Sequence, residues 1–293
     1  MDLPAGISRE VEDTHPGRSR ITSAQAVHGG CITPVARIQF NDGTSAFLKW
    51  SEAAGVPTDF FREEAHSLRA LAATGTVRTP AVLGEGSAWL LLEWLEPGRA
   101  EALTWQDLGR NLARMHKKQT ESFGWKRDNW IGSLPQSNSR HDRWADFWRH
   151  ERISPQWSRA RASGFLTEEN ERLLDRVMRS LDDLLAPGDV DGPSLLHGDL
   201  WNGNVLVLSG GVAALIDPSS YRGHREVDLA MAALFGGFTA DFFREYERTW
   251  PLTPGWQRRR HVYQLYYLLV HVNLFGMSYV TGVRSALHGA LRD

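Results

Sequence analysis

The stretch at 194–220 reads SLLHGDLWNGNVLVLSGGVAALIDPSS, and it carries the strongest fold signal in the chain. Two apolar runs, Val205–Leu208 and Val212–Ile216, flank a Ser-Gly-Gly turn. Apolar runs that are joined by a short glycine-rich turn predict a β-hairpin. We therefore expect a hairpin whose open end lies between Asn204 and Asp217.

Oxygen-bearing side chains gather around the open end of that hairpin. Antiparallel pairing is expected to set Asn204 and Asp217 opposite each other. Asp199 lies five residues before Asn204, in a short loop after the run SLLH. Two carboxylates and an amide oxygen suit Mg²⁺, which prefers oxygen ligands and shares them with substrate phosphates. The sequence therefore predicts a magnesium and phosphate site at this edge.

The spacing of these residues matches a phosphoryl-transfer site. In such sites a loop Asp takes the proton of the substrate hydroxyl, while an Asn soon after it and an Asp beyond the next hairpin hold the metal. For any one residue, simply ending a strand is the plainer interpretation. The complete spacing favours a kinase, with Asp199 as the catalytic base and with Asn204 and Asp217 as metal ligands.

The N-terminal half supplies independent support for a kinase. Lys49 lies inside the apolar run SAFLKW, and lysine is rare in this chain, which has four Lys among its 33 basic residues. In the expected helix Phe60–Ala73, Glu64 falls at the centre of the apolar face and Glu63 well to one side. A buried carboxylate needs a partner, so we expect Lys49 and Glu64 to pair beside the phosphates. A half-exposed glutamate is the plainer alternative.

Two further segments are weaker signals for nucleotide binding. Gly29 and Gly30, in HGGCIT, are expected to cover phosphates through their backbone N–H groups. The backbone at Glu93 and Leu95, in LLLEWLEPG, is expected to pair with an adenine edge. Two alternatives stay open: HGGCIT is an ordinary turn, and LLLEWLEPG is an ordinary core strand. Cys31 adjoins the glycines, and its oxidation is a hypothesis for inhibition.

Composition narrows the function classes. The chain has 293 residues, 42% of them hydrophobic, and a net charge of −2, so no broad basic field is present to hold nucleic acid. The apolar run at 261–280 contains His261, Gln264, His271 and Asn273, which predicts a buried helix of a soluble protein rather than a membrane span. The N-terminal residues show no secretory-signal pattern.

A lone cysteine excludes an internal disulfide and fits a reducing, cytoplasmic compartment. The order of the apolar patterns predicts an α+β, two-lobed, protein-kinase-like fold. A small β-rich nucleotide-binding lobe is expected over 1–95, with mostly strands and one helix. A larger, mainly helical lobe for catalysis and substrate binding is expected over 96–293, with helical segments near 104–119, 140–152, 167–186, 226–248 and 257–280.

These motifs resemble the aminoglycoside-phosphotransferase/protein-kinase-like superfamily and, more narrowly, the fructosamine (ketosamine) kinase family. The resemblance covers nearly the whole chain. It rests on AFLKW, FFREEAHSL, LLLEWL, LLHGDLWNGN, IDPSSYRGHREVDLAM and, at 123–138, FGWKRDNWIGSLPQSN. The spacing HGD-x4-N is shared with other small-molecule kinases, whereas the 123–138 stretch is much more specific to this family.

The resemblance implies ATP- and Mg²⁺-dependent phosphorylation of the sugar 3-hydroxyl in ketosamines. The substrate would be a small ketosamine or a glycated protein, and the unstable product would release the free amine. Asp199 would be the base, and Asn204 and Asp217 would be metal ligands. Lys49 and Glu64 would form the pair on the phosphate side.

The resemblance also implies roles near the sugar. Trp201 would lie beside it, and His271 and Asn273 are candidate substrate residues. His197 and Asp228 would brace the catalytic loop. Plain core packing is the alternative for Trp201, His271 and Asn273. The chain departs from the family pattern at Asn202 and at Arg225, and both are expected to tune substrate choice.

Two other functions stay open from the sequence. An aminoglycoside or other hydroxyl-metabolite phosphotransferase would share the fold, but the 123–138 stretch favours ketosamines. A nucleotide-binding pseudokinase is the other, but it would not need all five of the expected polar residues, which are Lys49, Glu64, Asp199, Asn204 and Asp217. No nucleic-acid or membrane partner is expected. The oligomeric state is open, with a monomer favoured, and so is the choice among fructosamine, ribulosamine and erythrulosamine.

Overall fold

The computed structural model describes the whole chain except residues 16–18, 28–32, 52–55, 58, 119–121 and 293. The chain forms two compact units, and neither is continuous in sequence. The first contains Met1–Thr104 and Val205–Pro218, and the second contains Trp105–Asn204 and Ser219–Asp293. The described part of the first unit is built on a sheet and that of the second is mostly helical, so the predicted α+β class is confirmed.

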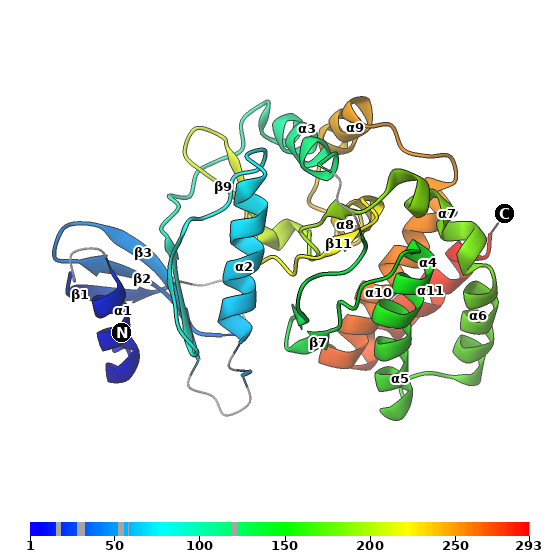
Figure 1. Ribbon diagram of the computed structural model, residues 1–293, viewed down its shortest axis with the longest axis horizontal. Coiled ribbons are helices and arrows are strands. Elements are labelled where there is room, and N and C mark those ends of the chain that lie inside the picture. The colour runs from blue at the N-terminus through cyan, green and yellow to red at the C-terminus, as the bar shows by residue number, and fades with distance from the viewer. Residues whose placement is uncertain (16–18, 28–32, 52–55, 58, 119–121, 293) are drawn as a thin grey trace. The chain divides into compact units, whose positions relative to one another are not determined.

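The first unit is organised around a five-stranded antiparallel sheet with strand order β1-β2-β3-β5-β4 (Figure 1). A tight turn at Asn41-Asp42-Gly43 joins the second and third strands, and Gly43 adopts there a positive φ of 85°, which glycine allows. The strands are β1 (Ile21–Ala26), β2 (Val35–Phe40), β3 (Ser45–Trp50), β4 (Val82–Glu85) and β5 (Trp89–Glu93).

Helices cover both faces of this sheet. Successive side chains of a strand point to opposite faces, so β5 sends Trp89 and Leu91 toward helix α1 (Ala5–Thr14), and Leu90 and Leu92 toward helix α2 (Phe60–Ala73). Burial on both faces explains why β5 reads as an almost continuous apolar run. The expectation of a single helix here was wrong, because α1 buries only Ile7 and Val11 and its pattern is therefore faint.

The glycine-turn hairpin packs within the first unit. Its strands are β9 (Val205–Val207) and β10 (Ala213–Leu215), shorter than predicted, with Val205 opposite Leu215. The Gly98 N–H donates to the Val207 carbonyl at 2.8 Å, and the Leu215 N–H donates to the Arg78 carbonyl at 2.8 Å. A Cβ at Gly98 would lie 2.4 Å from the Leu208 carbonyl, so only glycine lets the segment before α3 approach the hairpin.

The second unit is mainly helical, as predicted, although several expected helices are divided. Its helices are α3 (Thr104–His116), α4 (Trp144–Phe147), π-helix η2 (Trp148–Ile153), α5 (Ser154–Ala162), α6 (Glu168–Arg179), α7 (Leu181–Asp191), 3₁₀-helix η3 (Asn202–Asn204), α8 (Glu226–Ala232), α9 (Ala240–Thr249), α10 (Trp256–Phe275), 3₁₀-helix η4 (Met277–Tyr279) and α11 (Val280–Ala290). Two short antiparallel strand pairs accompany them, β6 (Asn129–Ile131) with β7 (Leu134–Gln136), and β8 (Ser194–Leu195) with β11 (Arg222–Gly223).

Helix α10 forms the centre of the second unit's core. It is buried on several faces, and it packs against α5, α8 and α11. This explains why the part of α10 from Val262 to Val272 is mostly apolar. In the described part of the chain, no helix is both long enough and apolar enough to cross a membrane.

Candidate active site

Lys49 lies at the centre of a buried charge cluster in the first unit. The alternation of β3 points Lys49 to the face that α2 covers. Its Nζ lies 2.7 and 2.9 Å from the two carboxylate oxygens of Glu64, and 3.0 Å from Oδ1 of Asp217. The side chains of Lys49 and Glu64 are 6% and 10% exposed. The pair that the helical pattern predicted is therefore present.

Opposing effects act on the pKa of Glu64 in this cluster. Burial raises the pKa of Glu64, Lys49 opposes that shift, and the Asp217 carboxylate adds to it. The carboxylate of Asp217 is an oxygen donor of the type that Mg²⁺ prefers.

Glu63 differs from its prediction. The helical pattern set it well to one side of the apolar face, but the structure buries it, with a carboxylate oxygen 3.5 Å from Nδ1 of His66. That prediction was wrong because α2 is covered over a wider arc than its apolar side chains mark.

Asp217 has an unusual backbone conformation. Its φ of +54° is the one positive value among the described non-glycine residues. A non-glycine residue in this region is strained, typically by about 1–3 kcal/mol, and such residues cluster at functional sites. Aspartate tolerates it better than most residues. The structure therefore holds this carboxylate at some expense to folding stability.

Glu93 and Leu95, whose backbone is expected to pair with adenine, differ in whether the N–H group already has a hydrogen-bond partner. The Glu93 N–H donates to the Ala81 carbonyl at 2.8 Å, and its carboxylate accepts from Arg78 and from the Ala81 N–H. Leu95 is 7% exposed, and among the described residues no hydrogen bond uses its backbone N–H. A buried N–H normally has a partner, so Leu95 is suited to donate to a ring nitrogen of a ligand.

The glycine-rich segment belongs to no described element. Gly29, Gly30 and Cys31 lie outside the described residues. Their expected roles in covering phosphates and in oxidation stay predictions.

In the second unit, Asp228 holds the loop that precedes Asp199. Its carboxylate accepts from the backbone N–H of His197 at 2.8 Å and from that of Gly198 at 2.9 Å. The Nε2–H of His116 donates to the same carboxylate at 3.1 Å, and the Tyr246 hydroxyl donates to Nδ1 of His116 at 2.8 Å. The chain of bonds therefore runs from Tyr246 to the catalytic loop.

Burial and hydrogen bonding together set the protonation of the Asp228–His116 pair. Burial raises the pKa of Asp228, but the hydrogen bonds that its carboxylate accepts, from His116 first and also from the Gly198 N–H, outweigh burial, so the net shift is downward. Burial lowers the pKa of His116 more than Asp228 raises it. The pair is therefore an ionised aspartate and a neutral histidine.

His116 is a site residue that sequence reasoning missed. A usable signal was present, because His116 follows Leu112 by one helical turn and shares the buried face of α3. A polar side chain on an apolar face needs a partner, which is the argument that identified Glu64.

The catalytic loop brings Asp199 and Asn204 together. The Asn204 side-chain N–H₂ donates to the Asp199 carbonyl at 2.8 Å and to its Oδ2 at 3.0 Å. A cation would therefore bind Asn204 through its amide oxygen. Gly198 has φ +84°, and a Cβ there would lie 2.0 Å from the Ser219 carbonyl, so this bend before Asp199 requires glycine.

Two aromatic side chains flank the loop. The Tyr267 hydroxyl donates to the Gly198 carbonyl at 2.8 Å, and burial raises the pKa of Tyr267 well above its ordinary value, which keeps the proton in place. Trp201 is half-buried against the core. A Cβ at Gly203 would lie 2.2 Å from its indole, so glycine lets the ring lie across the loop.

The stretch at 123–138 forms a buried amide cluster, which we define as Asn129, Gln136 and Asn138. Gln136 and Asn138 each donate to Oδ1 of Asn129 at 2.8 Å. Asn129 in turn donates to the Ser220 carbonyl at 2.8 Å, and Gln136 donates to the Ser219 carbonyl at 3.3 Å. The cluster therefore fixes the backbone that follows Asp217-Pro218.

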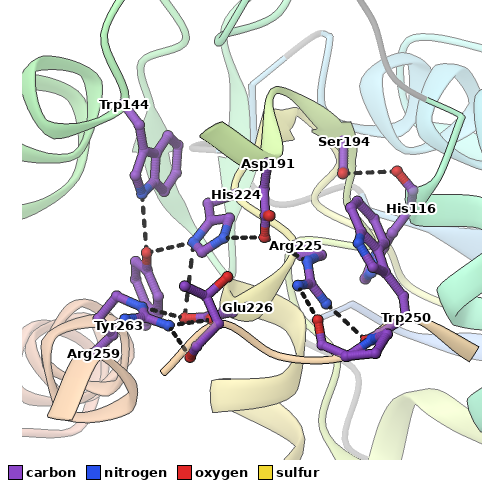
Figure 2. A network of polar contacts seen from close by, with 12 residues as sticks. His116, Trp144, Asp191, Ser194, His224, Arg225, Glu226, Trp250, Arg259 and Tyr263 are labelled. Carbon is purple, nitrogen blue, oxygen red and sulfur yellow. Dashed lines mark hydrogen bonds and ion pairs between the residues drawn. The ribbon is translucent and has the colours of Figure 1, made fainter. Parts of the chain in front are cut away.

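Arg225 does not have the expected role. It is buried, its Nε donates to Asp191 at 2.6 Å, and its Nη atoms donate to the carbonyls of Trp250 and Pro251 (Figure 2). Figure 2 shows the neighbouring pairs His224–Asp191 and Arg259–Glu226 in the same network. A side chain engaged in this way cannot select a substrate, so the prediction for Arg225 was wrong.

Two candidate substrate residues lie on α10. The Asn273 amide nitrogen donates to the backbone and side-chain oxygens of Gln156 at 2.9 and 2.8 Å, so that part of the side chain is engaged within the unit. Nδ1 of His271 lies 2.8 Å from the Tyr267 carbonyl and therefore donates to it. The exposed Asn202 lies against Gly237, where a Cβ would approach the Asn202 side chain to 2.4 Å.

Comparison with known proteins identifies the family. The sequence profile described as fructosamine kinase matches residues 5–293. The chain belongs to the fructosamine kinase family. This confirms the resemblance drawn from the motifs, and it makes the chain a phosphotransferase that acts on hydroxyl groups and uses ATP.

Members of the fructosamine kinase family resemble the chain along nearly its full length. A probable ketoamine kinase of Synechocystis sp. is 38% identical over 292 residues, which cover 98% of this chain and 96% of the relative. A chloroplastic protein-ribulosamine 3-kinase of Arabidopsis thaliana is 32% identical and covers 97% and 87%. The crystal structure of a candidate fructosamine-3-kinase from Thermobifida fusca has a TM-score of 0.90, with 34% identity and coverage of 99% and 100%.

A more distant likeness bears on the fold alone. Macrolide 2′-phosphotransferase from Brachybacterium faecium matches with a TM-score of 0.61 at 16% identity, over 98% of each chain. The kinase-like fold that the motifs predicted is therefore confirmed.

Proposed function

We propose that the chain transfers the γ-phosphate of ATP to the 3-hydroxyl of the sugar in ketosamines. The observation that carries this proposal is the loop in which Asn204 bonds the carboxylate and carbonyl of Asp199, in a member of the fructosamine kinase family. Relatives named ketoamine kinase and protein-ribulosamine 3-kinase support the choice of acceptor. The product, a ketosamine 3-phosphate, would be unstable and would release the amine, so the reaction would repair glycated amines.

Asp199 is the proposed catalytic base. Its carboxylate would accept the proton of the attacking hydroxyl, and the bond from Asn204 would fix its orientation. The Asp228 carboxylate would act one step away, because it holds the N–H groups of His197 and Gly198. Phosphoryl transfer depends mainly on such positioning and on charge neutralisation.

The first unit supplies the proposed nucleotide contacts. Lys49 would bind the phosphates, and Glu64 would hold its ammonium in place. The Leu95 N–H would pair with the adenine edge, together with the backbone at Glu93. Gly29 and Gly30 are included in the proposal from the sequence alone.

Mg²⁺ is the proposed metal, with Asn204 and Asp217 as its protein ligands. The Asp217 side chain is 31% exposed beside Lys49, so its carboxylate is accessible to a cation. Within the described residues, no three His, Cys, Asp or Glu side chains converge as a metal site. Mg²⁺ commonly takes one or two carboxylates and fills its shell with water and phosphate oxygens. When bound, it would neutralise charge on the transferred phosphoryl group.

Several finer points are part of the proposal and rest on the sequence. Trp201 is the proposed sugar contact, because its half-buried indole has an apolar face that suits a sugar ring. We expect a glycated protein or a small ketosamine as substrate, a monomeric enzyme and a cytoplasmic location.

The test is ADP release with Mg-ATP and a panel of ribulose-lysine, fructose-lysine, kanamycin, choline and no acceptor. We expect turnover with a ketosamine alone, and the ranking of the two sugars will name the preferred one. Turnover with kanamycin or choline instead would contradict the proposed acceptor while keeping the kinase. ATP binding without any turnover would favour a pseudokinase.

A further inference from the structure

Four aromatic rings form a surface cluster at the end of α10, which we call the His271 cluster. The ring of His271 lies 4.8 Å from that of Phe235, 5.5 Å from that of Phe275 and 4.9 Å from that of Tyr279. Phe235 is 42% exposed and Phe275 is 61% exposed, as is the adjoining Met277 at 68%. Adjoining apolar side chains left this open on a surface commonly mark a binding site.

The histidine at the centre of the cluster has a defined tautomer. Its Nδ1 lies 2.8 Å from the Tyr267 carbonyl, which can only accept, so Nδ1 carries the proton. Burial lowers the pKa of His271 more than this bond raises it, and the ring is therefore neutral. Nε2 is then a hydrogen-bond acceptor, and none of the hydrogen bonds found among the described residues uses it.

Two independent contacts connect the cluster to the catalytic loop. Tyr267 precedes His271 by one helical turn on the same side of α10, and its hydroxyl bonds the Gly198 carbonyl, next to Asp199. On the other side, Gly237, which follows Phe235 by two residues, lies against the side chain of Asn202. The cluster therefore adjoins the loop that carries the proposed base and the proposed sugar contact.

The cluster offers the chemistry that a ketosamine nitrogen requires. In a ketosamine the sugar is linked through a secondary amine, which is cationic at neutral pH when the amine is an alkylamine such as lysine. A cation is attracted to the faces of aromatic rings, and desolvation strengthens that attraction. A neutral imidazole nitrogen can also accept one of its N–H groups. The apolar rings suit the carbon chain beyond the nitrogen.

We propose that the His271 cluster binds the ammonium group and the adjoining carbon chain of the ketosamine, and so selects aminated sugars over free sugars. This proposal rests on the function proposed above and names a part of the substrate site. The phosphate acceptor would lie at the catalytic loop, and the amine-bearing part of the substrate would extend across Phe235, His271, Phe275 and Tyr279.

The experiment measures a selectivity ratio. It compares kcat/KM for Nα-acetyl-Nε-fructosyl-lysine with kcat/KM for free fructose, which lacks the nitrogen and the chain. We expect Phe275→Leu and Tyr279→Leu each to lower that ratio by about 3- to 30-fold, the range of a cation–aromatic contact. Phe243→Leu is the matched control, since Phe243 is also a partly exposed ring of this unit but packs in a different group with Phe238 and Phe242.

His271 is tested by a pair of substitutions. His271→Phe keeps a ring in the cluster but removes the acceptor, whereas His271→Gln retains a polar atom near the position of Nε2. We expect His271→Phe to lower the ratio about tenfold and His271→Gln to restore most of it. A loss of packing alone would instead affect Gln more than Phe.

A binding measurement distinguishes failure of this proposal from failure of the proposed function. Calorimetric titration of the same ketosamine does not require turnover, and the cluster variants should bind it more weakly than wild type. Unchanged ratios, or equal losses for both sugars, would overturn the proposal even in an active enzyme. If the wild type phosphorylates no ketosamine, the proposed function fails. In that case, equal affinity of wild type and Phe275→Leu, or no binding, would overturn the cluster's role as well.

Discussion

Lys49 and Asp217 lie 168 residues apart in the chain, yet Nζ of the lysine is 3.0 Å from Oδ1 of the aspartate. Both residues belong to the same compact unit, and the hairpin before Asp217 is hydrogen-bonded to Arg78 and Gly98 of its N-terminal segment. The carboxylate proposed to hold the metal is therefore fixed to the strand proposed to hold the phosphates.

Replacing Lys49 tests this relationship. We expect Lys49→Met to remove the ammonium that lies between the Glu64 and Asp217 carboxylates, and to lower the free energy of unfolding by about 3 kcal/mol. It should also raise KM for ATP. Lys49→Arg is the control that keeps the charge, and it should recover stability more than activity, because a planar guanidinium cannot reproduce the contacts of an ammonium. Thermal denaturation and ADP release provide the two measurements, and full stability in Lys49→Met would contradict the ion-pair argument.

The strained backbone of Asp217 makes a second prediction. Asp217→Gly and Asp217→Ala both remove the carboxylate and its contact with Lys49, but only glycine adopts φ near +54° without strain. We expect both variants to be inactive, with the glycine variant more stable by about 1 kcal/mol. The measurement is the difference between their unfolding midpoints in urea. Equal midpoints would show that the backbone relaxes without cost.

Substituting the proposed base tests its chemical role. Asp199→Asn keeps the shape and the neighbours of the side chain, so ATP affinity should hardly change. We expect kcat with a ketosamine to fall about 10²- to 10⁴-fold, the range for removal of a general base. Asp175→Asn, on the exposed side of α6, is the matched control. A variant with near-normal kcat would exclude Asp199 as the base.

The buried His116–Asp228 pair predicts how stability depends on pH. The folded state holds His116 neutral, so below about pH 6.5 the unfolded state binds more protons. Stability from this group is complete above that pH and decreases as the pH falls, by up to about 1.4 kcal/mol per pH unit. Asp228, whose pKa is lowered, adds a further loss of the same sign below about pH 4.

His116→Gln should reduce that pH dependence. A glutamine can still donate to Asp228 and accept from Tyr246, but it does not titrate. Melting temperatures between pH 5.5 and 8 should therefore fall less steeply in the variant than in wild type. His261 and His271, whose pKa values burial also lowers, will keep part of the slope. Parallel curves would show that His116 does not contribute.

Gly203 predicts an effect on the acceptor alone. A Cβ at this position would lie 2.2 Å from the Trp201 indole, so Gly203→Ala must displace the ring. We expect KM for the ketosamine to rise about tenfold, as for the loss of one good contact of roughly 1.4 kcal/mol, with KM for ATP unchanged. Gly6→Ala, where nothing lies within 4 Å, is the control. An unchanged KM would argue against Trp201 as the sugar contact.

The sequence predicted best where local pattern and burial agree. The bounds of α2 are those expected, because the apolar stripe of the helix reflects the face that it buries. The Lys49–Glu64 pair could be predicted for the same reason, since a carboxylate at the centre of an apolar stripe requires a partner.

Other features depend on distant segments and could not be read from local pattern. Helix α1 shows too few apolar residues to stand out, and its place is set by the second face of the sheet. Arg225 lies in a motif that suggests substrate contact, but Asp191 and the carbonyl of Trp250 enclose it. His116 and Tyr267 reach the catalytic loop from helices far away in sequence, and only the fold brings them there.

The split composition of the first unit has a consequence for how the protein is made. Its last segment, Val205–Pro218, is synthesised only after the whole of Trp105–Asn204. During translation, the N-terminal sheet is therefore synthesised a hundred residues before the hairpin that precedes Asp217, because Trp105–Asn204 of the other unit lies between them. A fragment ending at Thr104 would lack the backbone partners of Gly98 and Arg78. Because the first unit is built from two separate segments of the sequence, one cut cannot separate the two units, and the first unit cannot be exchanged between genes as one continuous segment.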